Sequence, residues 1–264
     1  MAQDLTPLFL EWPHDPDDDN KNVRCVRGDD GQLKIQVRVR CGIFQWEYDG
    51  RPDGARPHGH TSLLDYYLER IQALDRGKKG DASLRLAKEQ LEEISEELMD
   101  YYQRRVLFFR LGEYERARSD AEHNLRLMDI IHHHVEDAEQ ILQHEKWRPF
   151  VTMDRTRADA MMSCQRGDPL SGIHKIDLGI EEIADFFRRH HREDLIPLSQ
   201  EIAALKDLKH QLRENYGVPL TRDEVLEGLR EEQAKAIAEE DYERAARLRD
   251  EISRYEKGEG PVAV

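Results

Sequence analysis

Residues 229–252 read LREEQAKAIAEEDYERAARLRDEI, and this stretch predicts two helices joined by a tight turn. Small and apolar residues recur at spacings of three and four on one side of each helix, which is the pattern of an amphipathic helix. Asp241 stands where the second helix begins, and its carboxylate can accept hydrogen bonds from the free N–H groups of the first turn. Thr221 and Glu224 form a capping box that opens the first helix. We therefore expect a helical hairpin over residues 222–257.

The hairpin resembles the UVR motif, which is named for the UvrB and UvrC subunits of bacterial excision repair. The resemblance rests on residues 236–252, which follow the pattern Ala-Ile-x-x-Glu-Asp-Tyr-Glu-x-Ala-Ala-x-Leu-Arg-Asp-x-Ile. This form is closest to the variants in Clp-type unfoldase subunits and in the activator of a bacterial arginine kinase. Gln233 departs from the pattern, because an apolar residue is common there in the repair proteins.

A hairpin of this size is too small to bury its own apolar faces, so it needs a partner surface. In the proteins that it resembles, another chain supplies a second hairpin and completes a four-helix arrangement. The resemblance therefore implies a bacterial protein that binds a UVR-bearing or Clp-like protein, or a second copy of itself as a homodimer. The expected partner-binding residues are Leu229, Ile237, Tyr242, Ala245, Ala246, Leu248, Arg249, Asp250 and Ile252. The other interpretation, in which the hairpin packs on the chain's own helices, stays open.

The region before the hairpin predicts a series of helices, at about 62–76, 83–111, 114–145, 149–165, 168–191 and 199–215. Residues 113–117 (EYERA) nearly repeat residues 241–245 (DYERA), and Gly167-Asp168 marks a similar turn. Each turn supplies a helix start, but their unequal spacing differs from the fixed period of a solenoid. We expect residues 61–217 to form a tetratricopeptide-like helical array.

The first 60 residues predict a small β-hairpin followed by a turn-rich loop. Its two arms are Val23–Arg27 and Leu33–Tyr48, and apolar and polar residues alternate from Leu33 onward, as in a strand with one buried face. A lone hairpin is marginally stable in water, so this one should pack on the helices. The expected fold is therefore mainly α, an antiparallel helical array in three parts, 1–60, 61–217 and 218–264.

The composition limits the classes of partner. The chain of 264 residues has 38% hydrophobic and 36% charged residues and a net charge of −15. This acidity disfavours binding to nucleic acids or to an anionic membrane surface. Three widely spaced cysteines fit a reducing compartment, and no basic and apolar leader or long apolar run is present. We expect a cytoplasmic protein with no membrane segment.

The loop Arg51–His60 is the best candidate for a ligand site outside the hairpin. Arg51 and Arg56 are fork-shaped donors beside glycines, which allow an anion to approach the backbone closely. Asp53 and His58 complete the candidate set. The alternative is that these residues form a structural turn, since Pro-Asp-Gly is turn chemistry.

No metal site or catalytic motif can be read from the spacing. His132, His133 and His134 are adjacent, so a helix points them in different directions. Cys25, Cys41, His58 and His60 lie at spacings unlike those of zinc sites, and the acidic residues 15–19 lack the glycine of a calcium loop. Phosphate-loop, nucleophile-elbow and HExxH patterns are absent from the sequence. We therefore expect no metal, no cofactor and no enzymatic activity.

Three hypotheses for the function follow, in order of preference. The first is a non-enzymatic adaptor or scaffold that uses the hairpin to bind a partner, in protein quality control or the stress response. The second is an accessory factor in DNA damage repair, through association with excision-repair proteins. The third is a ligand-binding protein, or an enzyme, that uses the Arg51–His60 loop.

Overall fold

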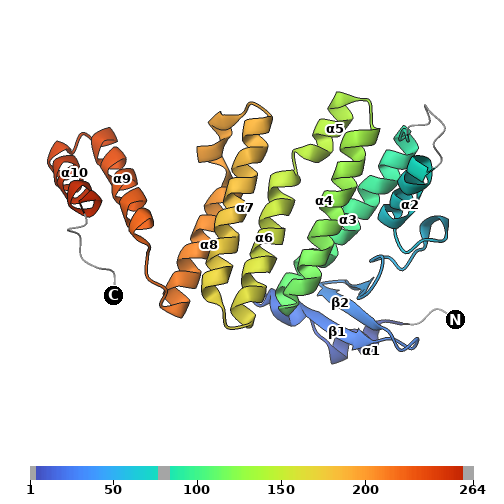
Figure 1. The fold of residues 1–264 in the computed structure, drawn as a ribbon. Coiled ribbons are helices and arrows are strands. Elements are labelled where there is room, and N and C mark those ends of the chain that lie inside the picture. The colour runs from blue at the N-terminus through green and yellow to red at the C-terminus, as the bar shows by residue number, and fades with distance from the viewer. Residues whose placement is uncertain (1–3, 77–83, 258–264) are drawn as a thin grey trace. The chain divides into compact units, whose positions relative to one another are not determined.

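The structure is a computed structural model that describes residues 4–76 and 84–257 (Figure 1). The chain forms two compact units, Met1–Lys206 and Asp207–Val264. The division falls inside a helix, whereas the sequence predicts a boundary at residue 218. The helices are α1 (Thr6–Glu11), α2 (Leu63–Arg76), α3 (Lys88–Leu111), α4 (Tyr114–His134), α5 (Ala138–Glu145), α6 (Arg148–Gln165), α7 (Pro169–Arg189), α8 (Gln200–Tyr216), α9 (Arg222–Ala238) and α10 (Tyr242–Glu256). The short 3-10 helices are η1 (Asp19–Asn22), η2 (Pro57–Gly59) and η3 (Glu193–Leu198).

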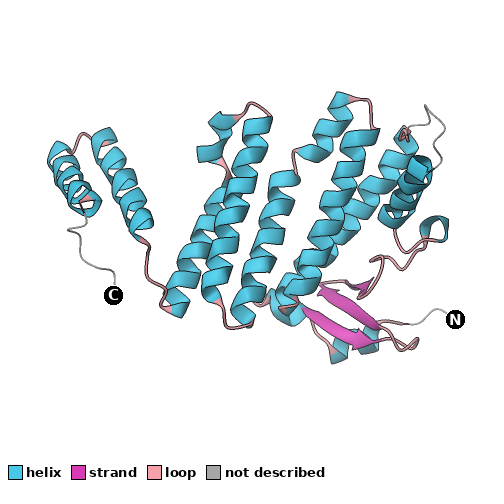
Figure 2. Cartoon of the chain, in the orientation of Figure 1, coloured by secondary structure: helices cyan, strands magenta, loops and turns pink. Residues whose placement is uncertain are grey.

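The first unit is built on long helices that pack side by side in chain order (Figure 2). The prediction of a mainly α fold is confirmed. The close packing of α6 on α7 depends on Gly179, because a Cβ added there would clash with the side chain of Thr156. Within the described residues no helix combines the length and the apolar character needed to cross a membrane.

The single helix predicted over 114–145 is wrong, because the chain breaks between α4 and α5. Val135 leaves the helical conformation, and the carboxylate of Asp137 accepts hydrogen bonds from the backbone N–H groups of Glu139 and Gln140. An aspartate that caps a new helix in this way competes with continuation of the old one. The regular apolar spacing runs through the break, so periodicity alone did not predict it.

Three turns between helices share one hydrogen-bond pattern, as their related sequences suggest. The residue before each new helix cap has a positive φ, of 72°, 80° and 59°, at Gly112, Gly167 and Glu240. The next residue donates its N–H to the carbonyl five residues earlier, in the pairs Glu113–Phe108, Asp168–Ser163 and Asp241–Ala236. This is the Schellman motif. It shows that the turns are alike, whereas the tetratricopeptide-like character of the array stays a prediction.

The N-terminal β structure is a three-stranded antiparallel sheet in the order β1-β2-β3, and not a two-stranded hairpin. Its strands are β1 (Val23–Arg27), β2 (Leu33–Val39) and β3 (Gly42–Glu47). The predicted second arm divides at Arg40-Cys41, where the chain turns back so that Val39 pairs with Gly42. One face of the sheet packs on the helices through a buried cluster, Val23, Ile35, Tyr48, Leu107, Phe108, Ala117 and Ala158. The sheet therefore packs on α3, α4 and α6, as expected for a sheet that is too small to be stable alone.

Candidate functional site

The C-terminal hairpin is closed by an inner seam between α9 and α10. The inner seam consists of Ala236, Ala245 and Leu248, which are buried, and Leu229, which is half-buried. Leu226 and Ile252 are also buried and continue the same stripes at helical spacing. Gln233 is half-buried between them, and its Nε2 donates to the carbonyl oxygen of Ala245 at 3.3 Å. The polar residue that departs from the expected pattern is therefore satisfied inside the seam.

Capping interactions and ion pairs fix the ends of the hairpin. The predicted capping box at Thr221 and Glu224 is present, and Asp241 accepts a hydrogen bond from the N–H of Arg244 at 3.0 Å. Arg222 donates to the carbonyl oxygens of Tyr255 and Glu256, at 2.6 and 3.0 Å. These contacts satisfy backbone groups that every helix end leaves free. The hairpin can therefore form its secondary structure from its own residues.

Glu224 also ties the hairpin to the last part of α8 within the same unit. Its carboxylate forms ion pairs with Lys209 and Arg213 and accepts hydrogen bonds from Thr221. Partial burial acts to raise the pKa of Glu224, but the hydrogen bonds from Lys209, Thr221 and Arg213 outweigh it and lower the pKa to about 2. The carboxylate thus stays ionised well below the usual range of a glutamate.

A family model described as UvrB/uvrC motif matches residues 223–258. The hairpin is a UVR motif. No curated protein and no solved structure matches the chain. The sequence-based recognition of the motif is confirmed, and a UVR motif is an interaction module for proteins or DNA. The match covers the C-terminal hairpin and leaves the first unit without a family.

The predicted partner-binding residues of the UVR motif fall into two groups. Ala245, Leu248 and Ile252 are buried within the unit, and Leu229 is half-buried, so these four stabilise the hairpin itself. The other five are exposed: Ile237, Tyr242, Ala246, Arg249 and Asp250. Helical spacing alone does not separate the buried residues from the exposed ones, because the two sets lie on neighbouring stripes of the helix surface. Their role in partner binding stays a prediction.

Four of these five exposed residues, all but Asp250, lie on one face of the UVR motif. Tyr242, Ala246 and Arg249 stand at positions i, i+4 and i+7 of α10, so they share one side of that helix. Ile237 shares a side of α9 with Arg230, seven residues earlier, and Arg230 reaches across to Glu256 of α10 at 2.6 Å. Glu256 follows Arg249 by seven residues and so lies on the same side of α10. The ion pair between Arg230 and Glu256 therefore places this side of α10 beside the side of α9 that carries Ile237. We call Ile237, Tyr242, Ala246 and Arg249 the outer face.

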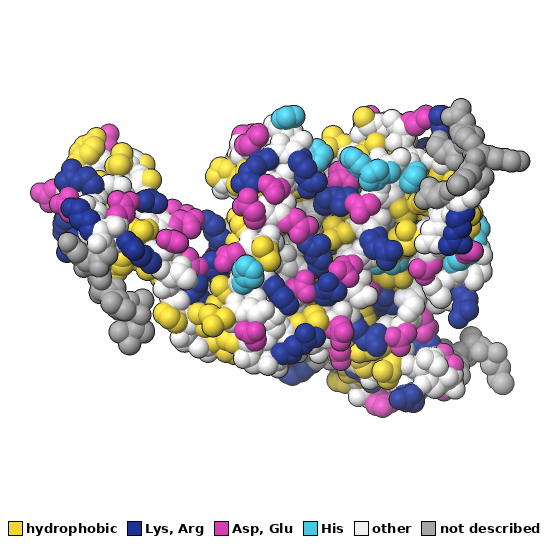
Figure 3. Space-filling model, viewed as in Figure 1, with side chains coloured by type: hydrophobic (Ala, Val, Ile, Leu, Met, Phe, Trp, Pro, Cys, Tyr) yellow, Lys and Arg dark blue, Asp and Glu magenta, His cyan; other side chains and the backbone are white. Residues whose placement is uncertain are grey.

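The outer face combines apolar and charged groups. Ile237 is 53% exposed and Tyr242 is 68% exposed, although both are large hydrophobic residues. They flank the turn of the hairpin, where the space-filling view shows hydrophobic side chains gathered (Figure 3). Arg249 pairs with the neighbouring carboxylate of Asp250 at 2.8 Å. The structure thus leaves an aromatic and an aliphatic side chain in solvent beside a charged rim.

In the first unit, the predicted ligand loop has a structural role. Arg51 forms ion pairs with Asp53 at 3.1 Å and with the fully buried Glu97 at 3.5 Å. Glu97 in turn accepts hydrogen bonds from the N–H groups of Leu63 and Leu64, which begin α2. The guanidinium of Arg51 therefore helps to hold a buried helix cap, which supports the structural interpretation of the loop.

The remaining residues of the loop are arranged as a turn. The carboxylate of Asp53 accepts a hydrogen bond from the N–H of Ala55, and His58 has a φ of 52° and stacks on the ring of Tyr66 at 4.1 Å. Arg51 and Arg56 both line a shallow cleft of about 290 Å³, together with Asp30, Lys34, Glu47 and Asp49. The carboxylates among these residues disfavour an anion there. Ligand binding by the loop stays a prediction.

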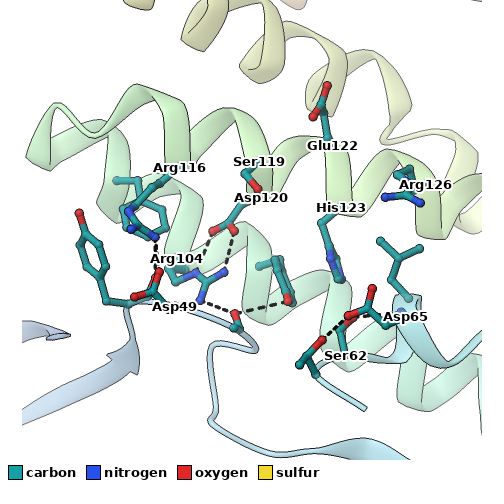
Figure 4. A pocket seen from close by; sticks show the side chains of 16 residues that line it. Asp49, Ser62, Asp65, Arg104, Arg116, Ser119, Asp120, Glu122, His123 and Arg126 are labelled. Carbon is teal, nitrogen blue, oxygen red and sulfur yellow. Dashed lines mark hydrogen bonds and ion pairs between the residues drawn. The ribbon is translucent and has the colours of Figure 1, made fainter. Parts of the chain in front are cut away.

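A second polar cleft, of about 370 Å³, opens beside the loop (Figure 4). Arg104 spans it and makes two hydrogen bonds with Asp120, at 2.9 and 2.7 Å, and further ones with the carbonyl oxygens of Glu47 and Gly50. Burial raises the pKa of Asp120, while the hydrogen bonds from Arg104 oppose that shift. This arrangement joins α3, α4 and the loop after β3 into one body.

The polar cleft contains histidine and hydroxyl side chains, which are common in active sites, but His123 and Ser62 are bonded to different partners. His123 stacks on Tyr101 at 3.5 Å, and its Nε2 lies 2.8 Å from the carboxylate of Glu97. The hydroxyl of Ser62 accepts a hydrogen bond from the N–H of Asp65. Within the described residues of this cleft, no hydroxyl group forms a nucleophile–base pair with a histidine. The hydrogen bonds of Arg104 contribute to holding the fold together at this cleft, and the expectation that the protein is not an enzyme stays a prediction.

The buried arginines of α3 were not predicted, although the sequence contains a signal for them. Tyr101, Arg104 and Phe108 follow helical spacings of three and four, so the arginine lies on the buried side of the helix. A charged residue on such a stripe requires a buried partner. The identity of the partner, Asp120, could not be read from spacing, because the chain contains 55 acidic residues.

The candidate metal ligands are not brought together. Cys25 lies on β1 and Cys41 at the turn before β3, and both are exposed. Among the residues that the structure describes, no group of three or more His, Cys, Asp or Glu side chains is placed to hold a metal ion. The expectation that the protein needs no metal or cofactor stays a prediction.

Proposed function

We propose that the protein is a non-enzymatic adaptor of the bacterial cytoplasm that binds a helical protein partner through the outer face of its UVR motif. The observation that carries the proposal is the exposure of Ile237 and Tyr242 in a hairpin whose inner seam is already filled. Apolar groups that the fold does not need to expose mark interaction sites when they lie together.

The composition of the outer face suits a helix–helix interface. Tyrosine and arginine are enriched among the residues that dominate binding energy, and Tyr242 and Arg249 supply one of each. Ala246 between them is small, so a partner helix can approach closely. The occupant that fits is another two-helix hairpin, supplied by a UVR-bearing or Clp-like protein or by a second copy of the chain. A partner of this kind points to protein quality control or the stress response.

The charge of the motif supports a protein partner over DNA. Residues 222–257 contain eight basic and twelve acidic side chains, which gives a formal charge of −4. Binding to DNA depends mainly on basic groups that neutralise phosphates, so an acidic hairpin is poorly suited to it. Participation in DNA repair, the second candidate function, would therefore proceed through association with a repair protein.

The proposal is tested by binding assays on the full chain with outer-face variants. Ala246→Glu places a charge between Tyr242 and Arg249, and Tyr242→Ala removes the aromatic group. Both sites are exposed, so the helical content measured by circular dichroism should not change. Ala245→Glu is unsuitable, because Ala245 lies in the inner seam and a charge there disrupts the hairpin itself.

The assays are sedimentation for self-association and titration with a purified Clp-type subunit and with a purified UvrB protein. We expect each outer-face variant to weaken the association of the wild-type chain by at least about tenfold, which is about 1.4 kcal/mol. Arg247→Ala, an exposed change on the other side of α10, should have little effect. If both outer-face variants fold and associate as the wild type does, the outer face is not the interface.

A further inference from the structure

An apolar cavity of about 430 Å³ lies between α3, α4, α5 and α6 in the first unit. Its walls are mostly apolar and aromatic, and they include Leu98, Tyr102, Met128, Phe150 and Val151. Met99 and Trp147 also line it and are about half exposed, at 52% and 56%. A concave apolar site of this size is typical of small-molecule binding. Neither the UVR motif nor the proposed adaptor function uses it.

A buried arginine without full hydrogen bonding lines this apolar cavity. Arg105 has an exposed fraction of 0%, and its Nε donates to Asp154 at 2.8 Å. Within the described part of the chain, its terminal nitrogens Nη1 and Nη2 have no hydrogen-bond partner. Buried polar groups are nearly always hydrogen-bonded in folded proteins. Two free donor groups on one guanidinium therefore indicate a missing acceptor.

A buried acceptor lacks a partner in the same cavity. The Nδ2 of Asn124 donates to the carbonyl oxygen of Leu98 at 3.0 Å, which fixes the orientation of the amide. Its Oδ1 is buried and, among the described residues, receives no hydrogen bond. The cavity therefore presents two unused donors on Arg105, one unused acceptor on Asn124 and apolar walls.

We propose that the apolar cavity binds an aromatic carboxylic acid that also carries one N–H or O–H donor. The guanidinium fork of Arg105 matches a carboxylate, because two parallel N–H donors can meet its two oxygens. Asp154 bonds the Nε side of the guanidinium and leaves the terminal nitrogens for the ligand. The aromatic body packs against Tyr102, Trp147 and Phe150, and the ligand's donor meets Oδ1 of Asn124. The protein is thereby a small-molecule receptor as well as an adaptor.

Three related probes separate the parts of this proposal in titrations of the full chain. Indole-3-acetate has the aromatic body, the carboxylate and an N–H donor; indole-3-acetamide lacks the carboxylate, and naphthalene-1-acetate lacks the N–H. We expect saturable binding of indole-3-acetate, measured by calorimetry. The amide should bind at least about tenfold more weakly, and naphthalene-1-acetate should fall between them.

Two results with the probes overturn the proposal. One is equal affinity for indole-3-acetate and indole-3-acetamide, because the carboxylate then meets no cation. The other is the absence of saturable binding of indole-3-acetate up to about 5 mM, where specific affinity becomes negligible.

Variants at the rim place the binding in this cavity without disturbing the core. Met99→Glu sets a carboxylate at the half-exposed rim and should weaken the binding of indole-3-acetate by about tenfold through repulsion. Leu178→Glu is the matched control, since Leu178 is 57% exposed on α7 and does not line the cavity. If both variants weaken binding equally, or neither does, the ligand lies elsewhere. Arg105→Lys should abolish the preference for indole-3-acetate over indole-3-acetamide. If that variant does not fold, the comparison of Met99→Glu with Leu178→Glu decides.

Discussion

Replacing Glu97 by alanine should destabilise the first unit by about 3–5 kcal/mol, the usual cost of removing one partner from a buried ionic group. The Glu97 side chain is fully buried. Its carboxylate lies 2.9 Å from the N–H of Leu63, 3.3 Å from that of Leu64, 2.8 Å from Nε2 of His123 and 3.5 Å from Nη1 of Arg51. Loss of the carboxylate leaves all four groups without this acceptor.

The magnitude can be built from the same contacts. Loss of the acceptor at the start of a helix costs about 1 kcal/mol, and Glu97 serves the first turn of α2 in that way. A hydrogen bond to a charged group contributes about 1.5–3 kcal/mol, and Glu97 makes one with His123 in addition to the pair with Arg51. A loss of about 1 kcal/mol in the free energy of unfolding lowers Tm by about 2–4 °C for a domain of this size. The Glu97→Ala variant should therefore melt about 6–20 °C lower than the wild type.

The assay is thermal unfolding of the full chain, with hydrogen exchange at the first turn of α2 as a local measure. Glu96→Ala is the matched control, because Glu96 precedes Glu97 on α3 but is exposed, and it should cost less than about 0.5 kcal/mol. Glu97→Gln keeps the shape and loses the charge, so its effect should be intermediate. A cost below about 1 kcal/mol for Glu97→Ala would refute the view that one carboxylate holds the start of α2.

The other predictions concern pH, packing and the hairpin turn. Because the pKa of Glu224 is lowered to about 2 from 4.5, its stabilising effect is present above pH 4.5 and is lost as the pH falls through 2; hydrogen exchange of α9 should therefore differ between wild type and Glu224→Gln at neutral pH and converge near pH 2. Gly179→Ala should cost about 1–3 kcal/mol in urea unfolding, because its methyl group meets Thr156, and Thr156→Ala should relieve most of that cost. Glu240→Gly should stabilise the hairpin by about 0.5–1 kcal/mol, since glycine tolerates the φ of 59° there, and slower exchange of the α10 amides would confirm it.

The helices could largely be predicted from the sequence because their signals are local. Asp168, Thr221 and Asp241 cap the helices that follow them, and the related turns at 113 and 241 share their hydrogen bonds. The break at Asp137 and the turn at Arg40-Cys41 were missed, since apolar periodicity continues through the first and strand alternation through the second. Both errors come from a pattern that persists where a local turn competes with it.

The candidate sites were harder to predict because they depend on contacts far apart in the chain. At the start of α2, the hydroxyl of Ser62 accepts a local hydrogen bond from the N–H of Asp65, three residues later. The cap on Leu63 comes from Glu97, 34 residues away, which no local pattern indicates. In the hairpin, alanines occur both in the inner seam and on the outer face, so spacing alone could not separate Ala245 from Ala246.

The packing of the N-terminal sheet sets an order of events during synthesis. The apolar side of the sheet includes Ile35, and its buried cluster is completed by Ala158 of α6. Ala158 is made 111 residues after Glu47, the last residue of β3 (158 minus 47). At about 5–20 residues per second, the ribosome needs about 5–20 seconds to supply it. Leu107, Phe108 and Ala117 are made before Ala158, so the apolar side of the sheet is covered in steps, first by α3 and α4 and last by α6.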